Sequence, residues 1–237
     1  MKPFVVLPLY IYPTDGSWDV LFAALASHPK LRFVIIINPS SGPGSPPNPD
    51  SDYVSAISKL RMYSNVDLLG YVHVTYATRP VALVQEDIDI YAGWRSYPGS
   101  RIHMDGIFFD EAPSKYPGGD YHYMQSVASY AKQKLGGTVM LNPGVAVDEA
   151  YYEISDLVIA CENTYQDYSG TPLDDLDHST RHRTCVLVHH FMGTVKDQEG
   201  FLTSLIRQQI GGIFISTEEY DSWSELWSDF CVVIASH

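Results

Sequence analysis

Eight short apolar segments recur along the chain, and stretches with the apolar spacing of helices separate most of them. The segments are rich in β-branched and aromatic residues and do not alternate cleanly, which is typical of strands buried on both faces. They cover residues 4–12, 33–38, 68–75, 106–110, 138–142, 157–162, 184–190 and 212–216. Parallel strands need long crossover connections, and eight such strands close a barrel. The pattern therefore predicts an α/β fold, a (β/α)8 TIM barrel formed as a single domain by residues 1–237.

The connections between these strands support a barrel. They predict helices over residues 18–26, 50–63, 80–94, 121–135, 148–154, 197–210 and 220–234. Residues 170–177 combine Gly, Pro and Asp, so we predict a long loop there between the sixth and seventh strands. The rival fold, an open doubly wound sheet, usually has a Gly-rich phosphate loop after its first strand, and residues 9–16 lack that fingerprint. Residues 39–49 hold five prolines, and we expect them to form a loop on the active face.

The chain is acidic, which limits its partners. It has 28 Asp and Glu residues against 15 Lys and Arg, and a formal charge of −13 at pH 7. Such a field repels nucleic acid and anionic membranes. No apolar stretch reaches the roughly 18 residues that cross a bilayer. We therefore expect no nucleic-acid partner and no membrane span, and we expect a monomer.

The start of the chain does not have the pattern of a secretory signal peptide. One Lys is followed by a strand-like run that contains prolines, with no small-residue cleavage site. This is expected of an intracellular protein or of a chain whose leader has been removed. The three cysteines are too few and too scattered for a disulfide framework or a zinc cluster, and they are Cys161, Cys185 and Cys231.

Polar side chains stand where the predicted strands end. The active site of a (β/α)8 barrel lies at the carboxyl ends of its strands, so these side chains should gather on one rim. Tyrosine and tryptophan combine an aromatic face with a polar tip, as sugar binding requires. The candidates for binding a substrate are Tyr10, Tyr12, Asn38, His73, Tyr76, Asn142, Asn163, Tyr165, His189 and Trp223.

Three acidic residues end two of the apolar strands. Asp110 ends the fourth strand and Glu111 follows it, and Glu162 ends the sixth. Two carboxylates across a cleft are the minimum for glycoside hydrolysis, because one protonates the leaving oxygen and the other is the nucleophile or the base for water. We predict Asp110, Glu111 and Glu162 as the catalytic residues, with Asp110 as nucleophile and Glu162 as general acid/base. Glu111 then positions the substrate, and the competing assignment makes Glu111 the acid.

One strand lies between the fourth and the sixth, so their ends should be about 10 Å apart. This distance fits both retaining and inverting chemistry, and we favour retention. The rival chemistry is metal hydrolysis with His73, His189, His190 and the carboxylates. Because His189 and His190 are adjacent on a strand, only one should face inward, and no HxH or HExxH pattern occurs. We expect no metal and no other cofactor.

Six stretches together resemble the spherulin-4-like family, which is grouped with glycoside hydrolase family 135. Their order and spacing along most of the chain make the resemblance fairly specific. They are residues 7–13 (LPLYIYP), 34–39 (VIIINP), 70–73 (GYVH), 105–111 (DGIFFDE), 141–144 (LNPG) and 162–165 (ENTY).

The resemblance implies a (β/α)8 barrel and an endo-acting α-1,4-N-acetylgalactosaminidase that cuts galactosaminogalactan, a fungal exopolysaccharide. It implies that the functional carboxylates are Asp110, Glu111 and Glu162. It also implies an extracellular or cell-wall location, which no leader in this sequence matches, so a cytoplasmic location stays open. Two other functions stay open: a catalytically silent carbohydrate-binding or developmental barrel, and a hydrolase of another α-galactosyl linkage. In each case the partner is a polysaccharide or an oligosaccharide.

Overall fold

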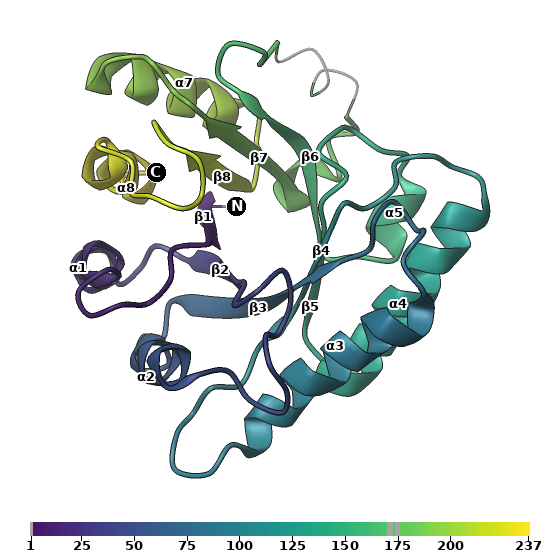
Figure 1. Cartoon of the computed structure of the whole chain (residues 1–237). Coiled ribbons are helices and arrows are strands. Elements are labelled where there is room, and N and C mark those ends of the chain that lie inside the picture. Colours follow the sequence, from purple (N-terminus) through teal and green to yellow (C-terminus); the bar gives the residue numbers. More distant parts are fainter. Residues whose placement is uncertain (1, 170–172, 174–175) are drawn as a thin grey trace.

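Eight parallel strands form the centre of the molecule. The computed structural model of the chain describes residues 2–169, 173 and 176–237. Each strand pairs with the next along the chain and β8 pairs with β1, so the sheet closes into a barrel (Figure 1). The predicted (β/α)8 barrel is confirmed. The strands are β1 (Phe4–Leu9), β2 (Phe33–Ile37), β3 (Val66–His73), β4 (Gly106–Asp110), β5 (Thr138–Leu141), β6 (Leu157–Thr164), β7 (Thr184–His189) and β8 (Gly212–Ile215).

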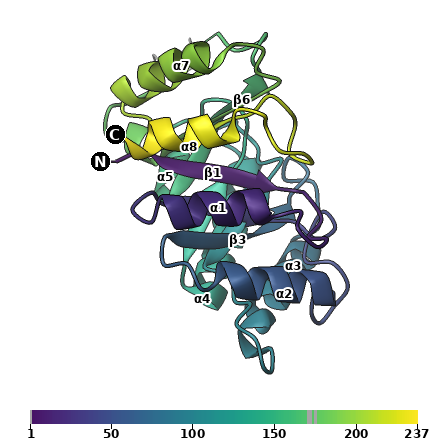
Figure 2. The same cartoon turned by 90° about the vertical axis from the view of Figure 1, so that its left-hand side faces the viewer.

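Helices surround the barrel, and Figure 2 shows β1 lying between α8 and α1. The helices are α1 (Asp19–Ser27), α2 (Ser51–Leu60), α3 (Val81–Gly93), α4 (Gly119–Leu135), α5 (Ala150–Glu153), α7 (Val195–Arg207) and α8 (Trp227–Ala235), with 3-10 turns η1 (Trp94–Ser96) and η2 (Arg181–Arg183). In the part of the chain that the structure describes, no helix has the length and apolar character to cross a bilayer. Part of the loop predicted before β7, residues 170–172 and 174–175, lies outside the described residues.

Local sequence explains where two helices begin and why one strand is buried. The Asp50 side chain accepts the backbone N–H groups of Asp52 and Tyr53 and so caps α2. Thr194 and Asp197 form a reciprocal capping box at the start of α7. All five residues of β2 are fully buried, as expected for a strand covered on both faces.

The last helix begins later than its sequence predicts. The apolar spacing predicts a helix from Tyr220, but α8 begins at Trp227. The hydroxyl of Ser224 accepts the backbone N–H groups of Thr217 and Leu226, and such local side-chain bonds compete with helix formation. Residues 220–226 therefore form a loop, which frees Tyr220 to reach the carboxyl rim of the barrel.

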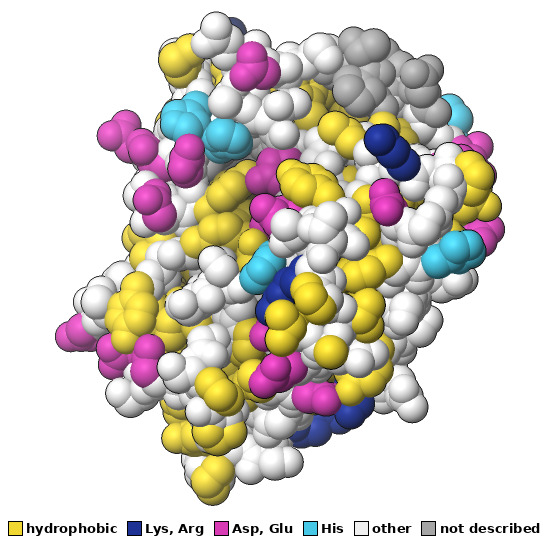
Figure 3. All heavy atoms as spheres, turned by 45° about the vertical axis from the view of Figure 1, so that its right-hand side comes forward, with side chains coloured by type: hydrophobic (Ala, Val, Ile, Leu, Met, Phe, Trp, Pro, Cys, Tyr) yellow, Lys and Arg dark blue, Asp and Glu magenta, His cyan; other side chains and the backbone are white. Residues whose placement is uncertain are grey.

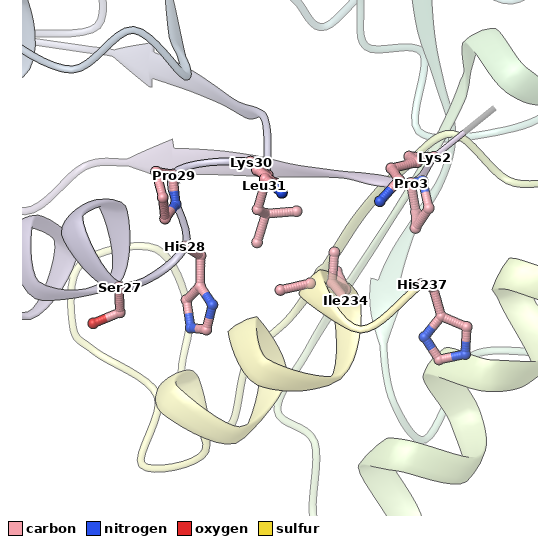
Figure 4. A pocket seen from close by; sticks show the side chains of 10 residues that line it. Lys2, Pro3, Ser27, His28, Pro29, Lys30, Leu31, Ile234 and His237 are labelled. Carbon is pink, nitrogen blue, oxygen red and sulfur yellow. The ribbon is translucent and has the colours of Figure 1, made fainter.

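A hollow of about 340 Å³ opens at the amino-terminal end of the barrel (Figure 4). It lies before β1 and β2 and beside the end of α8, and Leu31 and Ile234 are among its lining residues. Active sites of this fold lie at the opposite rim of the barrel, so this hollow does not mark the candidate active site.

Candidate active site

One amide nitrogen joins the carboxylates of β4 and β6. Nδ2 of Asn142 donates to Oδ1 of Asp110 at 2.8 Å and to Oε2 of Glu162 at 2.5 Å. Because both distances meet at one nitrogen, the two carboxylate oxygens are separated by at most their sum, 5.3 Å. The structure therefore brings two of the predicted catalytic residues together at the carboxyl rim.

The Asn142 side chain is fixed in its orientation. It is 7% exposed, and its Oδ1 accepts the backbone N–H of Gly144 at 3.0 Å. The Gly144 carbonyl in turn accepts the backbone N–H of Glu162 at 3.1 Å. Gly144 has a φ of +67°, a conformation that glycine adopts without steric cost. The turn after β5 thus directs the amide N–H2 group toward both carboxylates.

Two tyrosine hydroxyls complete the hydrogen bonding of the pair. Tyr71 donates to Oδ2 of Asp110 at 2.6 Å, and Tyr220 donates to Oε1 of Glu162 at 2.5 Å. The ring of Tyr10 packs edge-on against both tyrosine rings, with centroids 5.7 and 5.6 Å away. Each carboxylate oxygen of the pair therefore accepts a hydrogen bond in aromatic surroundings. Figure 3 shows acidic side chains beside hydrophobic ones near the middle of one face, with His side chains nearby.

The three tyrosines keep their protons at high pH. Burial, followed by the negative charge of Asp110, raises the pKa of Tyr10 and of Tyr71 well above the ordinary value. Burial and the charge of Glu162 do the same to the pKa of Tyr220. Tyr71 and Tyr220 therefore remain hydrogen-bond donors to the carboxylates throughout the neutral range.

These raised pKa values predict a loss of stability in alkali. In the unfolded chain tyrosines ionise near pH 10, whereas the folded chain retains the protons of Tyr10, Tyr71 and Tyr220. Above that pH the unfolded state binds fewer protons, so each group lowers the free energy of unfolding by about 1.4 kcal/mol per pH unit. Urea unfolding between about pH 8 and pH 11 measures this slope. Tyr220→Phe should reduce the slope of the free energy of unfolding against pH by the contribution of one proton. An unchanged slope would contradict a raised pKa for Tyr220.

Glu111 leaves the strand instead of continuing it. It follows the last residue of β4 and has a φ of +53°, so strand alternation does not set its direction. Its carbonyl accepts the backbone N–H of Tyr76 at 2.8 Å. Thr75, Tyr76 and Ala77 all have positive φ, between 48° and 65°. Left-handed conformations cost non-glycine residues about 1–2 kcal/mol each and cluster at functional sites. This turn holds Tyr76, which is 61% exposed, next to Glu111.

The imidazoles of His189 and His190 meet at the end of β7, where His189 is half-buried and His190 is exposed, so the expectation that only one of them faces inward stays a prediction. Their Nδ1 atoms are 2.6 Å apart. Strand β7 ends at His189, and His190 has a φ of +52°, which breaks the alternation of side chains along the strand. The His189 ring also packs edge-on against Tyr220, with centroids 5.8 Å apart. Burial, then the neighbouring His190, lowers the pKa of His189.

Two predicted binding residues hold the proline-rich loop to the rim. Oδ1 of Asn38 accepts the backbone N–H of Gly42 at 3.1 Å. Nδ1 of His73 lies 3.1 Å from the carbonyl oxygen of Ser41. The loop predicted for the active face therefore lies beside the ends of β2 and β3.

Four other predicted binding residues contact parts of the molecule other than the carboxylate pair. Tyr12 donates to Asp52 at 3.0 Å, Asn163 pairs with Val188 of β7, Tyr165 packs on Phe191 at 4.5 Å, and Trp223 donates to the Ser17 carbonyl at 2.7 Å. Their roles toward a substrate stay predictions.

The two tyrosines that bind the carboxylates are absent from the candidates that the sequence suggests. For Tyr71 a signal exists, since it stands two residues before His73 on the same face of β3. For Tyr220 the sequence offers none, because its position depends on the loop that replaces the first turns of the predicted last helix.

Fold and site together define a (β/α)8 barrel with a carboxylate pair at its carboxyl rim, the arrangement on which many glycoside hydrolases are built. Residues 4–234 match the family described as Spherulation-specific family 4, and the chain belongs to this family.

Known relatives agree with this membership. Spherulin-4 of Physarum polycephalum is 38% identical over 160 residues, which is 67% of this chain and 44% of that protein, so the chain spans less than half of that relative. The crystal structure of Aspergillus clavatus Sph3 in complex with GalNAc superposes with a TM-score of 0.92 and 35% identity, covering 99% of this chain and 98% of that one. A chitinase from Bacteroides thetaiotaomicron has a TM-score of 0.61 at 10% identity, covers 99% and 96%, and shares the fold alone.

Proposed function

We propose that this chain is a retaining glycoside hydrolase that cuts within polymers of α-1,4-linked N-acetylgalactosamine or galactosamine, such as galactosaminogalactan. The observation that carries the proposal is the pair of carboxylates bound to one Asn142 nitrogen. The two oxygens that share this nitrogen lie at most 5.3 Å apart, which is compatible with the roughly 5 Å of a retaining pair. The bound GalNAc of the similar Sph3 structure supports the sugar class.

The proposed reaction divides between the two carboxylates. Glu162 gives a proton to the leaving glycosidic oxygen while an oxygen of Asp110 attacks the anomeric carbon, which forms a glycosyl ester. Glu162 then takes a proton from water, and the water oxygen displaces Asp110 from the anomeric carbon. Tyr71 and Asn142 hold Asp110 in one orientation, which reduces the entropy lost on reaching the transition state.

The competing assignment, with Glu111 as the acid, can be separated by leaving-group chemistry. A substrate whose leaving group needs no protonation bypasses the acid in the first step. With an aryl α-N-acetylgalactosaminide, the variant of the true acid should regain most of its rate of phenol release, at least as a first-turnover burst. If the burst recovers in Glu111→Gln and not in Glu162→Gln, Glu111 is the acid and Glu162 is not.

Product analysis tests the function itself. The purified chain is incubated with galactosaminogalactan and with α-linked oligomers of galactose, galactosamine and N-acetylgalactosamine. We expect shorter oligosaccharides whose first-formed anomer, followed by NMR, is α. A β anomer would contradict retention, binding without products would indicate a silent barrel, and cleavage of galactose oligomers alone would indicate another linkage.

We expect the exposed ring of Tyr76 to pack against one sugar of a long substrate. Its left-handed turn holds the Tyr76 backbone next to Glu111, and the side chain is exposed. Loss of an aromatic contact worth about 1.4 kcal/mol raises KM about tenfold. Tyr76→Ala should therefore raise KM for long oligomers and leave kcat nearly unchanged, whereas Tyr76→Phe, which keeps the ring, should behave as the wild type. An unchanged KM in Tyr76→Ala would remove Tyr76 from the binding surface.

A further inference from the structure

Three side chains that follow the ends of β7 and β8 present metal-binding atoms to one another. His189 ends β7, His190 follows it, and Glu219 lies in the loop after β8. One ligand atom from each of the three lies within 4.8 Å of the other two. The left-handed backbone of His190 produces the cluster, because a continued strand would turn its imidazole away from His189.

We propose that His189, His190 and Glu219 form a binding site for a divalent transition-metal ion, Zn²⁺ being the best match. Two imidazoles and one carboxylate are a donor set found in zinc sites that keep a fourth position open. The two imidazole ligands disfavour Mg²⁺ and Ca²⁺, which prefer all-oxygen sites. The open position would face water or a sugar hydroxyl.

Coordination of an ion would require small movements of all three side chains. Ligand atoms at about 2.0–2.1 Å from a tetrahedral zinc ion stand roughly 3.3 Å apart. The two Nδ1 atoms, now 2.6 Å apart, must open slightly, and the Glu219 carboxylate must move toward them. His190 and Glu219 are exposed, so their side chains can turn. An Nδ1 contact this short requires a hydrogen on one ring, and that hydrogen moves to Nε2 of the same ring when both Nδ1 atoms bind the ion.

Calorimetric titration of Zn²⁺ into the metal-free full chain, without sugar, tests the site. We expect one ion per chain. His190→Asn should weaken binding about tenfold or more, because asparagine tolerates the left-handed backbone but lacks the imidazole. Glu219→Gln should also weaken it. His122→Ala, on the exposed face of α4, is the matched control and should bind as the wild type does.

Co²⁺ in place of Zn²⁺ gives a second readout, since its visible absorption reports the coordination geometry. We expect tetrahedral bands in the wild type and their loss in His190→Asn. Equal Zn²⁺ affinity in the wild type and His190→Asn, or no ion bound by the wild type, would overturn the proposal. Because neither measurement involves substrate, a failure here leaves the glycosidase proposal standing.

Discussion

Glu162→Gln is expected to lower kcat on the polymer about a thousandfold or more, and Asp110→Asn should have a similar effect. Each amide keeps the shape of the carboxylate but can neither transfer the proton nor form the glycosyl ester. Since both groups act in one reaction at one site, the double variant should lose little more than either single variant. Steady-state rates of new reducing ends measure all three.

The control for this series is Glu225→Gln, an exposed carboxylate before α8. It changes the net charge by the same unit and should keep full turnover. The thermal midpoint of each variant shows whether a loss of rate reflects a loss of fold. Full turnover in both Asp110→Asn and Glu162→Gln would place the active site elsewhere.

The convergence of these carboxylates could be predicted from the sequence because topology alone produces it. Eight buried apolar runs joined by helical crossovers leave a closed parallel barrel as the simplest arrangement, and its strands all end at one rim. Asp110 ends β4, Glu162 lies two residues before the end of β6, and Asn142 follows β5, the strand between them. Strand order therefore sets which side chains meet, even though no single segment specifies the contact.

The remaining parts of the site depend on backbone turns that the sequence does not specify. Strand alternation does not predict that the imidazoles of His189 and His190 meet, and the left-handed φ of His190 accompanies a distance of 2.6 Å between their Nδ1 atoms. Apolar spacing predicts a helix at Tyr220, and the hydroxyl of Ser224 replaces its first turns with a loop. Both failures occur at non-regular backbone beside the carboxylates, where strain and side-chain bonds outweigh periodicity.

Strand β4, which ends at Asp110, begins at a close approach between its own backbone and that of β5. A Cβ atom added to Gly106, the first residue of β4, would stand 1.9 Å from the carbonyl oxygen of Thr138 in β5. Backbone cannot move aside as a flexible side chain can, so the two strands would have to separate. We expect Gly106→Ala to lower the free energy of unfolding by about 3 kcal/mol or more, and the thermal midpoint by roughly 10 °C.

Gly200→Ala is the matched control, since it makes the same chemical change in the middle of α7, where the added Cβ meets no atom within 4 Å. Alanine in a helix should stabilise the chain by about 0.5–1 kcal/mol, so the two substitutions should shift the midpoint in opposite directions. The pairing of Gly106 with Thr138 also fixes the register in which Phe109 lies opposite Leu141. A Gly106→Ala chain that remains folded should therefore lose turnover as well, because a shifted β4 separates Asp110 from the Asn142 amide. Unfolding curves that coincide for Gly106→Ala and the wild type would show that this contact does not hold the carboxylate strand in place.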